Sequence, residues 1–400
     1  MIRVLLLLLL WLQWVQPVFA GLIQNPEVSG HLKTFDLSYM HPPGTPLADG
    51  FFSANDLRLQ WKGNLNAATE LEFAVDNLLL YSDHPSQLAL PLDSPNQRVS
   101  LSQDWNRGEN WSNRLGIDRL ALKGRSTLFD WSVGRQAIGF GRIVLFSPLD
   151  VVAPFAPDSL DTDTRPGVDA LRAVHYFGLG GQVGGTIVLG SQPDNNSYLL
   201  TLSKNQSGID LLGIGGSLRE RRLLGIGLAG SLGPLGIKGE ITHYQGKETA
   251  FPAGDLHDDF AIGAVELWYR FDSGIVLLTE YLYNGAGGNS PNDYPATAAS
   301  AAFREGISPL LGQQYLLLAP SWEVHPLLTL SGLMIRNLKD NSMLLRPQAQ
   351  ISLNDNINLE LFYSFNFGAK SRVLVPSISI PQSEFGAAGD SGGLLLRWYF

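Results

Sequence analysis

Apolar and polar residues alternate with a period of two through most of the chain. In the stretch SANDLRLQWKGNL, Leu57, Leu59 and Trp61 occupy the odd positions, and charged or amide side chains occupy the even positions. The next stretch, ATELEFAVDN, continues the alternation. A strand buried on both faces would not carry a carboxylate at every second position, so one face meets an apolar medium and the other meets water. The pattern predicts long, half-polar β-strands.

Turn sequences divide the chain into segments of strand length. Short turns are expected at 124–126, 232–234, 272–274 and 354–356, and long polar loops at about 82–110, 246–257, 286–310 and 368–388. Tight turns that alternate with long loops are typical of transmembrane β-barrels, whose tilted strands need roughly 9–11 residues to cross a bilayer. We therefore predict an all-β fold, a single transmembrane antiparallel β-barrel of about 16–18 strands. Residues 284–306, of low complexity, carry no packing pattern and are expected to form an unpacked loop.

The two ends of the chain agree with this fold. Residues 1–20 combine Arg3, an apolar run and small residues before Gly21, which predicts a cleaved secretory signal peptide and a barrel over 21–400. The last residues, GLLLRWYF, place Trp398 and Phe400 on one apolar face. A terminal aromatic residue on such a strand predicts the membrane-insertion signal of a closing barrel strand. We expect the outer-membrane lipid and the barrel-assembly machinery to be partners.

Composition removes several classes of function. The chain has no cysteine, which excludes disulfides, thiol catalysis and cysteine-ligated metals. Without the signal peptide it carries 27 basic and 37 acidic residues, so nucleic acid is not expected as a partner. The mean hydropathy of +0.03 fits a barrel in which lipid-facing and lumen-facing residues average out.

The parity of the strands assigns one set of charged residues to the lumen. Placing Arg or Lys on the lipid face costs about 2–4 kcal/mol at the bilayer midplane, so the charged face points inward. The predicted lumen-facing residues are Asp56, Arg58, Lys62, Glu70, Glu72, Asp76, Glu266, Arg270 and Glu280. They either line a pore or form ion pairs within the wall, and the sequence leaves both open.

One long irregular segment, residues 138–167, interrupts the strand rhythm. It is too apolar for a solvated surface loop and yet rich in charge. A wide barrel can hold such a segment inside its lumen, with the apolar side on the wall and the charges across the pore. We predict an inward-folded, pore-constricting loop; the alternative is a packed extracellular loop. The candidate constriction residues are Arg135, Arg142, Asp150, Asp161, Asp163, Arg165, Asp169 and Arg172.

The same segment resembles a protein family. The residues that carry the likeness are Gly134-Arg135-Gln136, Phe140-Gly141, Pro148-Leu149-Asp150 and the run RPGVDALR at 165–172. They resemble a recurring segment of bacterial outer-membrane porin-like and alginate-export-like β-barrels. The resemblance implies a pore in the outer membrane of a Gram-negative bacterium. A lysine- and arginine-lined conduit for a polyanion is not evident in this acidic chain.

No enzyme or cofactor chemistry is expected. None of the seven histidines sits beside a serine in a nucleophile elbow. The stretches SLDTDT and GDLHDD lack the ligand spacing of an EF-hand, and there is no haem-attachment or nucleotide-binding motif. We therefore predict no cofactor and no metal.

These observations favour a passive channel for small hydrophilic solutes or ions, with selectivity set by the inward loop. Two other functions stay open: a barrel sheath around a periplasmic or extracellular partner, such as a multihaem cytochrome electron conduit, or a polysaccharide exporter. A rim hydrolase is a further, weaker alternative. A homo-oligomer is compatible with the sequence, but no residue specifies its interface.

Overall fold

The structure is a computed structural model that describes residues 24–41, 48–85, 88, 94–178, 180–248, 254–375 and 378–400. The expected signal peptide, residues 1–20, lies outside the described residues.

Nineteen strands of the described residues form one antiparallel sheet. They are β1 (Gln24–Tyr39), β2 (Gly50–Asn66), β3 (Thr69–Ser82), β4 (Ser102–Arg107), β5 (Trp111–Arg125), β6 (Asp130–Gln136), β7 (Val168–Phe177), β8 (Gly181–Val188), β9 (Ser197–Gln206), β10 (Ile209–Leu218), β11 (Arg221–Leu232), β12 (Leu235–Gln245), β13 (Asp259–Arg270), β14 (Val276–Asn284), β15 (Gln314–His325), β16 (Leu328–Asn337), β17 (Met343–Asn354), β18 (Ile357–Phe367) and β21 (Ser391–Tyr399). A separate pair, β19 (Arg372–Val375) and β20 (Ile378–Ile380), forms a two-stranded sheet.

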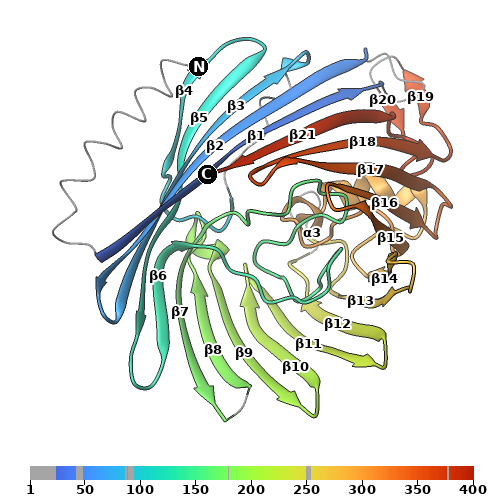
Figure 1. Cartoon of the computed structure of the whole chain (residues 1–400). Helices are drawn as coiled ribbons and strands as arrows, with labels where there is room; N and C mark the ends of the chain where they lie inside the picture. The colour runs from blue at the N-terminus through green and yellow to red at the C-terminus, as the bar shows by residue number, and fades with distance from the viewer. Residues whose placement is uncertain are drawn as a thin grey trace.

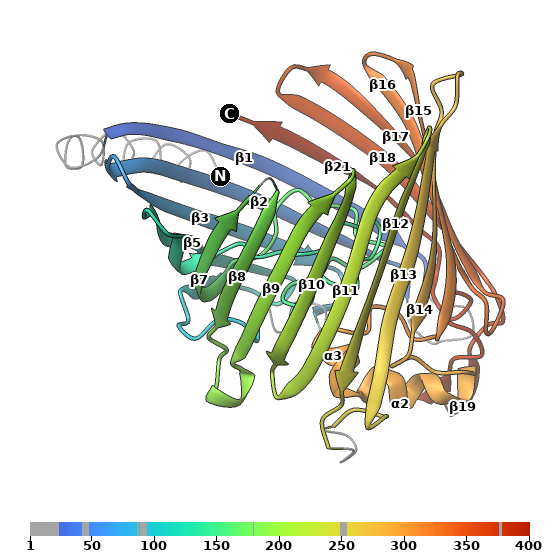
Figure 2. The same cartoon turned by 90° about the horizontal axis from the view of Figure 1, so that it is seen from below.

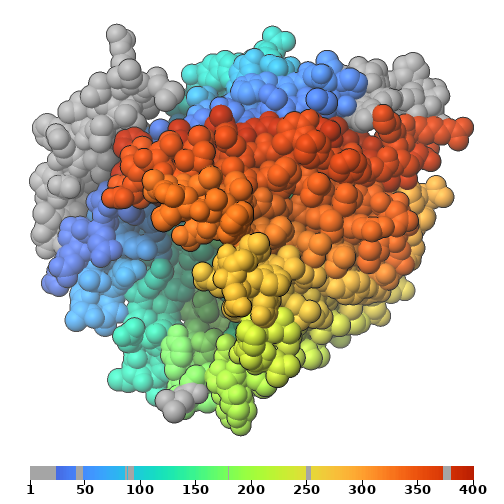
Figure 3. Space-filling model, turned by 45° about the vertical axis from the view of Figure 1, so that its right-hand side comes forward, coloured from blue at the N-terminus to red at the C-terminus, as the bar shows by residue number. Residues whose placement is uncertain are grey.

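The sheet closes into a barrel of 18 strands. β1 pairs with β2 on one side and with the last strand, β21, on the other, where Leu32 lies opposite Trp398. β4 pairs with the first half of β5, beside the place where β6 pairs with its second half, so β4 is an extra ribbon on the ring. In Figure 3 the red C-terminal surface lies directly between the orange strands and the blue N-terminal strands. The prediction of 16–18 antiparallel strands is confirmed.

Most of the short connections lie at one end of the barrel, although the turn between β10 and β11 and the one between β16 and β17 lie at the other end. The four turns predicted from the sequence join β5 to β6, β11 to β12, β13 to β14, and β17 to β18. The long segments connect the strands at the opposite end, where Figure 2 shows the helices and β19 gathered together. By the usual arrangement of such barrels, the short turns face the periplasm and the long segments face the outside.

The expectation of an unpacked loop at 284–306 is wrong. This segment forms η3 (Pro291–Asp293), α2 (Tyr294–Ala299) and α3 (Ala301–Arg304), and a further short helix, η2 (Pro193–Asn195), lies between β8 and β9. Tyr294 is fully buried, and its hydroxyl donates a 2.8 Å hydrogen bond to Asp340. The segment is therefore part of a packed cap at the extracellular end. No helix in the described part of the chain is long and apolar enough to cross a membrane.

Candidate functional site: a charged neck beside the inner arm

Residues 137–167, here called the inner arm, connect β6 to β7 without forming a helix or a strand. Figure 1 shows this green segment inside the ring of strands. It contacts strands on opposite sides of the ring: Arg142 N donates to Glu240 on β12, and Asp161 accepts from Lys33 on β1. The inner arm therefore crosses the lumen of the barrel.

One side of the inner arm forms the hydrophobic core of the protein. Its Ile138, Ile143, Phe146, Leu149, Val151 and Val152 pack with inward-facing residues such as Leu199, Leu212, Leu223, Tyr244, Ile262, Leu282 and Tyr315. Leu149 is fully buried and lies over Gly225 and Gly227 of β11. A Cβ atom on either glycine would come within 2.6 Å of the leucine methyl groups. The half of the lumen bounded by β9–β16 is thus filled by apolar side chains, not by water.

Three wall carboxylates hold the backbone of the inner arm. Glu240 accepts hydrogen bonds from Arg142 N at 2.7 Å and Leu149 N at 3.2 Å, and also from Ile143 N and the Ser147 hydroxyl. On the two following strands, Glu266 accepts from Val144 N at 2.6 Å and Glu280 from Phe146 N at 3.4 Å. Because an irregular segment cannot satisfy its own N–H groups, these carboxylates replace the partners that a sheet would supply.

Positively charged residues of the opposite wall hold the second half of the inner arm. Lys33 Nζ lies 2.8 Å from Asp161 Oδ2 and 3.2 Å from Asp163 Oδ2. Arg397 and Arg346 donate to the carbonyl oxygens of Leu160 and Asp158. Burial raises the pKa of Asp163, but the hydrogen bond from Tyr399 and the charge of Lys33 outweigh this effect and hold the pKa below its usual range. The Asp163 side chain therefore stays ionised near neutral pH.

The base of the inner arm is fixed by a further ion pair. Arg135 on β6 is opposite Asp169 on β7, donates to both of its carboxylate oxygens, and also donates to the carbonyls of Val99 and Ile117. Only 3% of Arg135 is exposed. Both residues are buried and join the strands to segment 94–99, and their predicted role at a constriction stays a prediction.

Within the inner arm, Asp150 and Arg165 form an ion pair at 2.5 Å. Burial raises the pKa of the Asp150 carboxyl to about 6, although Arg165 opposes this shift. The guanidinium of Arg165 also lies 4.9 Å from the centre of the Phe155 ring. This pair thus joins the two halves of the inner arm to each other.

Two hollows lie beside the inner arm, along the wall made by β1–β7. The periplasmic hollow has a volume of about 980 Å³ and is lined by Glu70, Glu72, Arg119, Lys123 and Arg172, among others. The extracellular hollow has a volume of about 520 Å³. Only Arg58 and Thr164 line both hollows among the described residues. These two residues mark the neck between the hollows.

The neck is charged on the wall side. Arg58 Nη1 donates to Asp76 at 2.9 Å and to Asp118 at 2.8 Å, and Arg58 is only 4% exposed. Asp118 also accepts from Gly167 N at 2.7 Å, while the neighbouring Arg119 donates to the Arg165 carbonyl at 2.6 Å. The wall and the inner arm are therefore joined by hydrogen bonds next to the neck.

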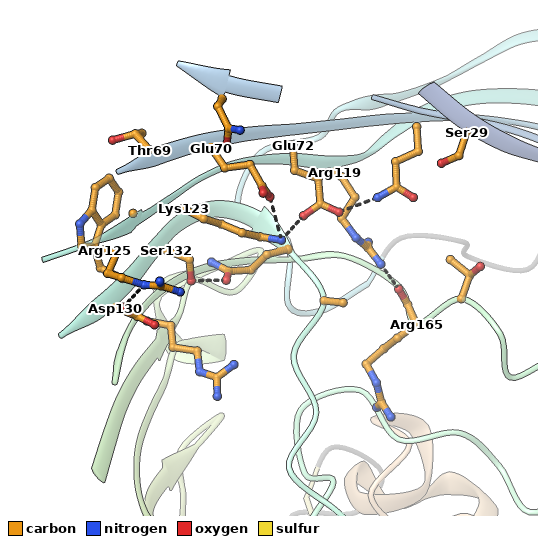
Figure 4. Close-up of a pocket in the computed structure, with 18 of the residues that line it drawn as sticks. Ser29, Thr69, Glu70, Glu72, Arg119, Lys123, Arg125, Asp130, Ser132 and Arg165 are labelled. Carbon is orange, nitrogen blue, oxygen red and sulfur yellow. Dashed lines mark hydrogen bonds and ion pairs between the residues drawn. The ribbon is translucent and has the colours of Figure 1, made fainter. Parts of the chain in front are cut away.

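Figure 4 shows the charges of the periplasmic hollow. Lys123 points toward Glu70 and Glu72, and its Nζ lies 2.5 Å from Glu72 Oε2. Arg125 pairs with Asp130 at the turn between β5 and β6. The hollow thus carries charges of both signs.

The remaining residues that were predicted to face the lumen or the constriction lie in different parts of the barrel. Arg142 pairs with Asp210 at 3.2 Å, and Arg172 lies 6.0 Å from the Phe140 ring and lines the periplasmic hollow. Lys62 is opposite Glu72 across β2 and β3, but Arg270 is exposed at the end of β13 and lines neither hollow. Asp56, 3.2 Å from His31, lines the extracellular hollow.

The ends of β1 and β21 meet next to the periplasmic hollow. Phe400 and Gly30 exchange two backbone hydrogen bonds, and the rings of Trp398 and Phe400 lie 5.4 Å apart on the outer surface. Their role as an insertion signal stays a prediction.

Sequence reasoning missed several residues of this site. Glu240 sits at the end of the Gly- and Leu-rich stretch 181–240, where the lumen charges are sparse. Lys33 is far in sequence from the segment that it holds. Asp118 and Arg119 are neighbours that both contact the inner arm because β5 has a β-bulge beside them, which strand parity does not predict. Thr164 carries no signal in the sequence. Among the described residues, no group of three or more His, Asp or Glu residues could hold a metal ion.

Comparison with known proteins shows which solved structures have a similar fold. No family model matches the chain, and no curated protein matches it in sequence. Solved structures do match. OccAB1 of Acinetobacter baumannii has a TM-score of 0.57 and is 9% identical in sequence, and the alignment covers 95% of this chain and 97% of that chain. OccAB3 of the same organism has a TM-score of 0.57 and 11% identity, over 94% and 99% of the two chains. A BenF-like porin from Pseudomonas fluorescens has a TM-score of 0.57 and 12% identity, over 95% and 100%.

At these identities the likeness concerns the fold. The chain has the fold of bacterial outer-membrane porins, β-barrels that cross the membrane with strands, and the predicted architecture is confirmed. The narrower resemblance to alginate-export-like proteins, and its motif, stays a prediction.

Proposed function

We propose that this protein is an outer-membrane channel through which small hydrophilic solutes or ions diffuse passively. The observation that carries the proposal is the pair of hollows, one on each side of the neck at Arg58 and Thr164. Their linings are rich in polar and charged residues, whereas the other side of the inner arm packs against an apolar cluster. The route for solutes therefore runs off-centre, between the inner arm and the wall of β1–β7.

The inner arm is the constricting element in this proposal. It narrows the lumen from one side, and it holds Asp161, Asp163, Thr164 and Arg165 against the passage. Fixed charges at a constriction select permeating ions by sign and size. The selectivity of the channel is therefore expected to depend on the neck and on the two hollows, whose extracellular lining includes Arg135.

The filled lumen argues for a channel over a sheath. A barrel that surrounds a partner protein needs a lumen open to that partner, but here the protein's own arm packs its apolar side chains against β9–β16. The charges of both signs in the hollows also do not form the basic conduit expected of a polyanion exporter.

Narrowing the neck tests the proposal. Thr164→Trp should lower the single-channel conductance in planar bilayers at least twofold, because the larger side chain fills the place where the two hollows meet. Leu200→Trp is the matched control, since Leu200 is 68% exposed on the outer face of β9 and should leave the conductance unchanged. Equal conductance of Thr164→Trp and the native protein would show that ions take another route.

A further inference from the structure

Five charged residues meet at the extracellular end of β10–β13. Arg221 is fully buried and donates to both carboxylate oxygens of Asp255, at 2.7 and 2.8 Å. It also donates to Glu305 Oε2 at 2.6 Å, and Lys247 Nζ donates to Glu305 Oε1 at 2.7 Å. The two carboxylates are thus already used by Arg221 and Lys247.

Arg219 adds a third positive charge to this group. It is 1% exposed, and its terminal Nη1 donates to the backbone carbonyl of Glu305 at 3.1 Å. Its Nε lies 3.4 Å from Glu305 Oε2, but Nε and Nη2 have no hydrogen-bond partner among the described residues. Three bases, the buried Arg219 and Arg221 and the partly exposed Lys247, therefore face two acids. Burial lowers the pKa of Arg219, and Glu305 only partly offsets this effect. An unmatched buried charge is costly unless something else neutralises it.

The backbone holds Arg219 in this place. Arg219 and Glu220 form the two-residue turn between β10 and β11, with φ angles of +46° and +70°. Residues other than glycine rarely adopt this left-handed backbone conformation, and among them asparagine tolerates it best. A strained turn that aims an arginine inward, with two free donors, needs a functional reason.

The free donors are on the edge of the guanidinium that binds oxyanions. Nε–H and one N–H of Nη2 point in the same direction and fit the two oxygens of a carboxylate or sulfate. Arg219, Glu305 and Gly306 line the extracellular hollow, which continues to Arg58 at the neck. The group is therefore located where a solute from outside would arrive before it reached the constriction.

We propose that Arg219 is the centre of a capture site for small oxyanions at the extracellular end of the passage. A bound oxyanion would satisfy both free donors of Arg219 and bring the local charge into balance. Glu305 would remain the partner of Arg221 and Lys247 and would limit the site to anions small enough to approach from the hollow. The capture role rests on the proposed channel, but binding at the site does not.

Sulfate is the probe that tests this site. Sulfate added on the side of the long loops should reduce the potassium chloride current of the native channel at millimolar concentrations. Arg219→Asn, which keeps a residue suited to the left-handed turn, should raise the sulfate concentration for half-reduction at least tenfold. Arg222→Asn is the matched control, because Arg222 is a basic residue of the same hairpin, is exposed, and by strand parity faces away from Arg221.

Calorimetric binding of sulfate to the detergent-solubilised protein provides the second readout. Sulfate binding that is lost in Arg219→Asn and kept in Arg222→Asn supports the site even if the protein does not conduct, in which case the channel proposal alone fails. A conducting protein whose current and calorimetry are insensitive to sulfate, or equally sensitive in both variants, overturns the site and leaves the channel standing. Heat-modifiable migration of each variant in gels confirms that the barrel is folded.

Discussion

At Gly225 and Gly227, one added Cβ atom would prevent the inner arm from packing against β11. Both lie on the inner face of β11, directly below Leu149. Glycine in a strand often marks a place where another part of the chain approaches closely. The two glycines could be read from the sequence, but the arm that approaches them comes from about 75 residues earlier, a separation that no local pattern bridges.

Gly225→Val should therefore displace the inner arm. The added side chain collides with Leu149, and overpacking of this kind costs about 1–3 kcal/mol. Digestion with thermolysin should cleave the arm at least several-fold faster than in the native protein. Gly230→Val on the outer face of the same strand is the control, since the nearest atom to its Cβ would be 3.5 Å away. Equal digestion of the two variants would contradict the packing described for Leu149.

Asp150 predicts how the docking of the inner arm depends on pH. Its pKa in the folded protein, about 6, is above the ordinary value of 3.8, so the docked arm binds a proton more readily than a released arm. The resulting stabilisation is fully present below pH 4 and is lost as the pH rises through 6.

Thermolysin-type digestion cannot cover this pH range, so pepsin at low pH or hydrogen exchange corrected for the intrinsic rate is the suitable measurement. Protection of the inner arm should fall by about tenfold or more between pH 4.5 and 7, because each unit of pKa shift corresponds to a tenfold change in the equilibrium. In Asp150→Asn the dependence should be flatter, while Asp194→Asn, in the short helix η2, should retain it. An unchanged slope in Asp150→Asn would mean that another group carries the effect.

At the scale of elements, the inner arm behaves as a strap fixed at both walls. Glu240, Glu266 and Glu280 accept its backbone N–H groups on one side, and Lys33 and Arg397 hold its acidic half and a carbonyl on the other. Neither contact set alone spans the lumen. The position of the arm thus depends on both.

Glu240→Gln tests the first of these attachments. The amide nitrogen of glutamine is a donor and cannot accept the hydrogen bonds that one carboxylate oxygen now accepts, so about 1–3 kcal/mol of docking free energy should be lost. The expected result is a noisier open-channel current with more frequent conductance steps. Glu323→Gln, at an exposed position of β15, should leave the current trace unchanged. If the open-channel current of Glu240→Gln is no noisier than that of the native protein, the apolar core alone holds the inner arm.

The alternation in the sequence predicted strands well where one face of the strand meets water. It predicted them poorly where neither face does. In β2 and β3 the inner face meets the hollows, so charges alternate with apolar residues and the strands can be read directly. In β9–β11 the inner face meets the inner arm and Leu199 faces it, while Leu200 faces outward. Both faces are then apolar and the alternation disappears. The strand boundaries in 181–240 therefore cannot be located from the alternation of the sequence.

The helical cap at 284–306 was missed for a different reason. Its helices are short, rich in alanine and pack through Tyr294, which gives no periodic apolar face to detect. A local signal was nevertheless present, because Ser290 and Asp293 form a capping box at the start of η3. The contacts of the inner arm, by contrast, join residues up to 237 positions apart and depend on closure of the barrel.

At the scale of the whole molecule, the closed barrel and the inner arm that partly fills it determine where space is left in the lumen. Eighteen strands make a lumen wide enough to hold water, and the inner arm fills one side of it, which leaves the two hollows beside β1–β7 for the route that we propose. The extracellular cap also holds a buried titratable group. Burial raises the pKa of Glu384 in this cap to about 7, despite hydrogen bonds from Tyr315 and Asn337 that oppose the shift.

The single-channel conductance of the purified protein, compared with that of a variant whose residues 140–165 are replaced by a short glycine-serine linker, tests the central claim most directly. We expect stable, stepwise conductance in the native protein and a larger step in the variant, because the constricting arm is gone. Absence of conductance in both folded proteins, or steps of equal size, would contradict a diffusion channel narrowed by the inner arm.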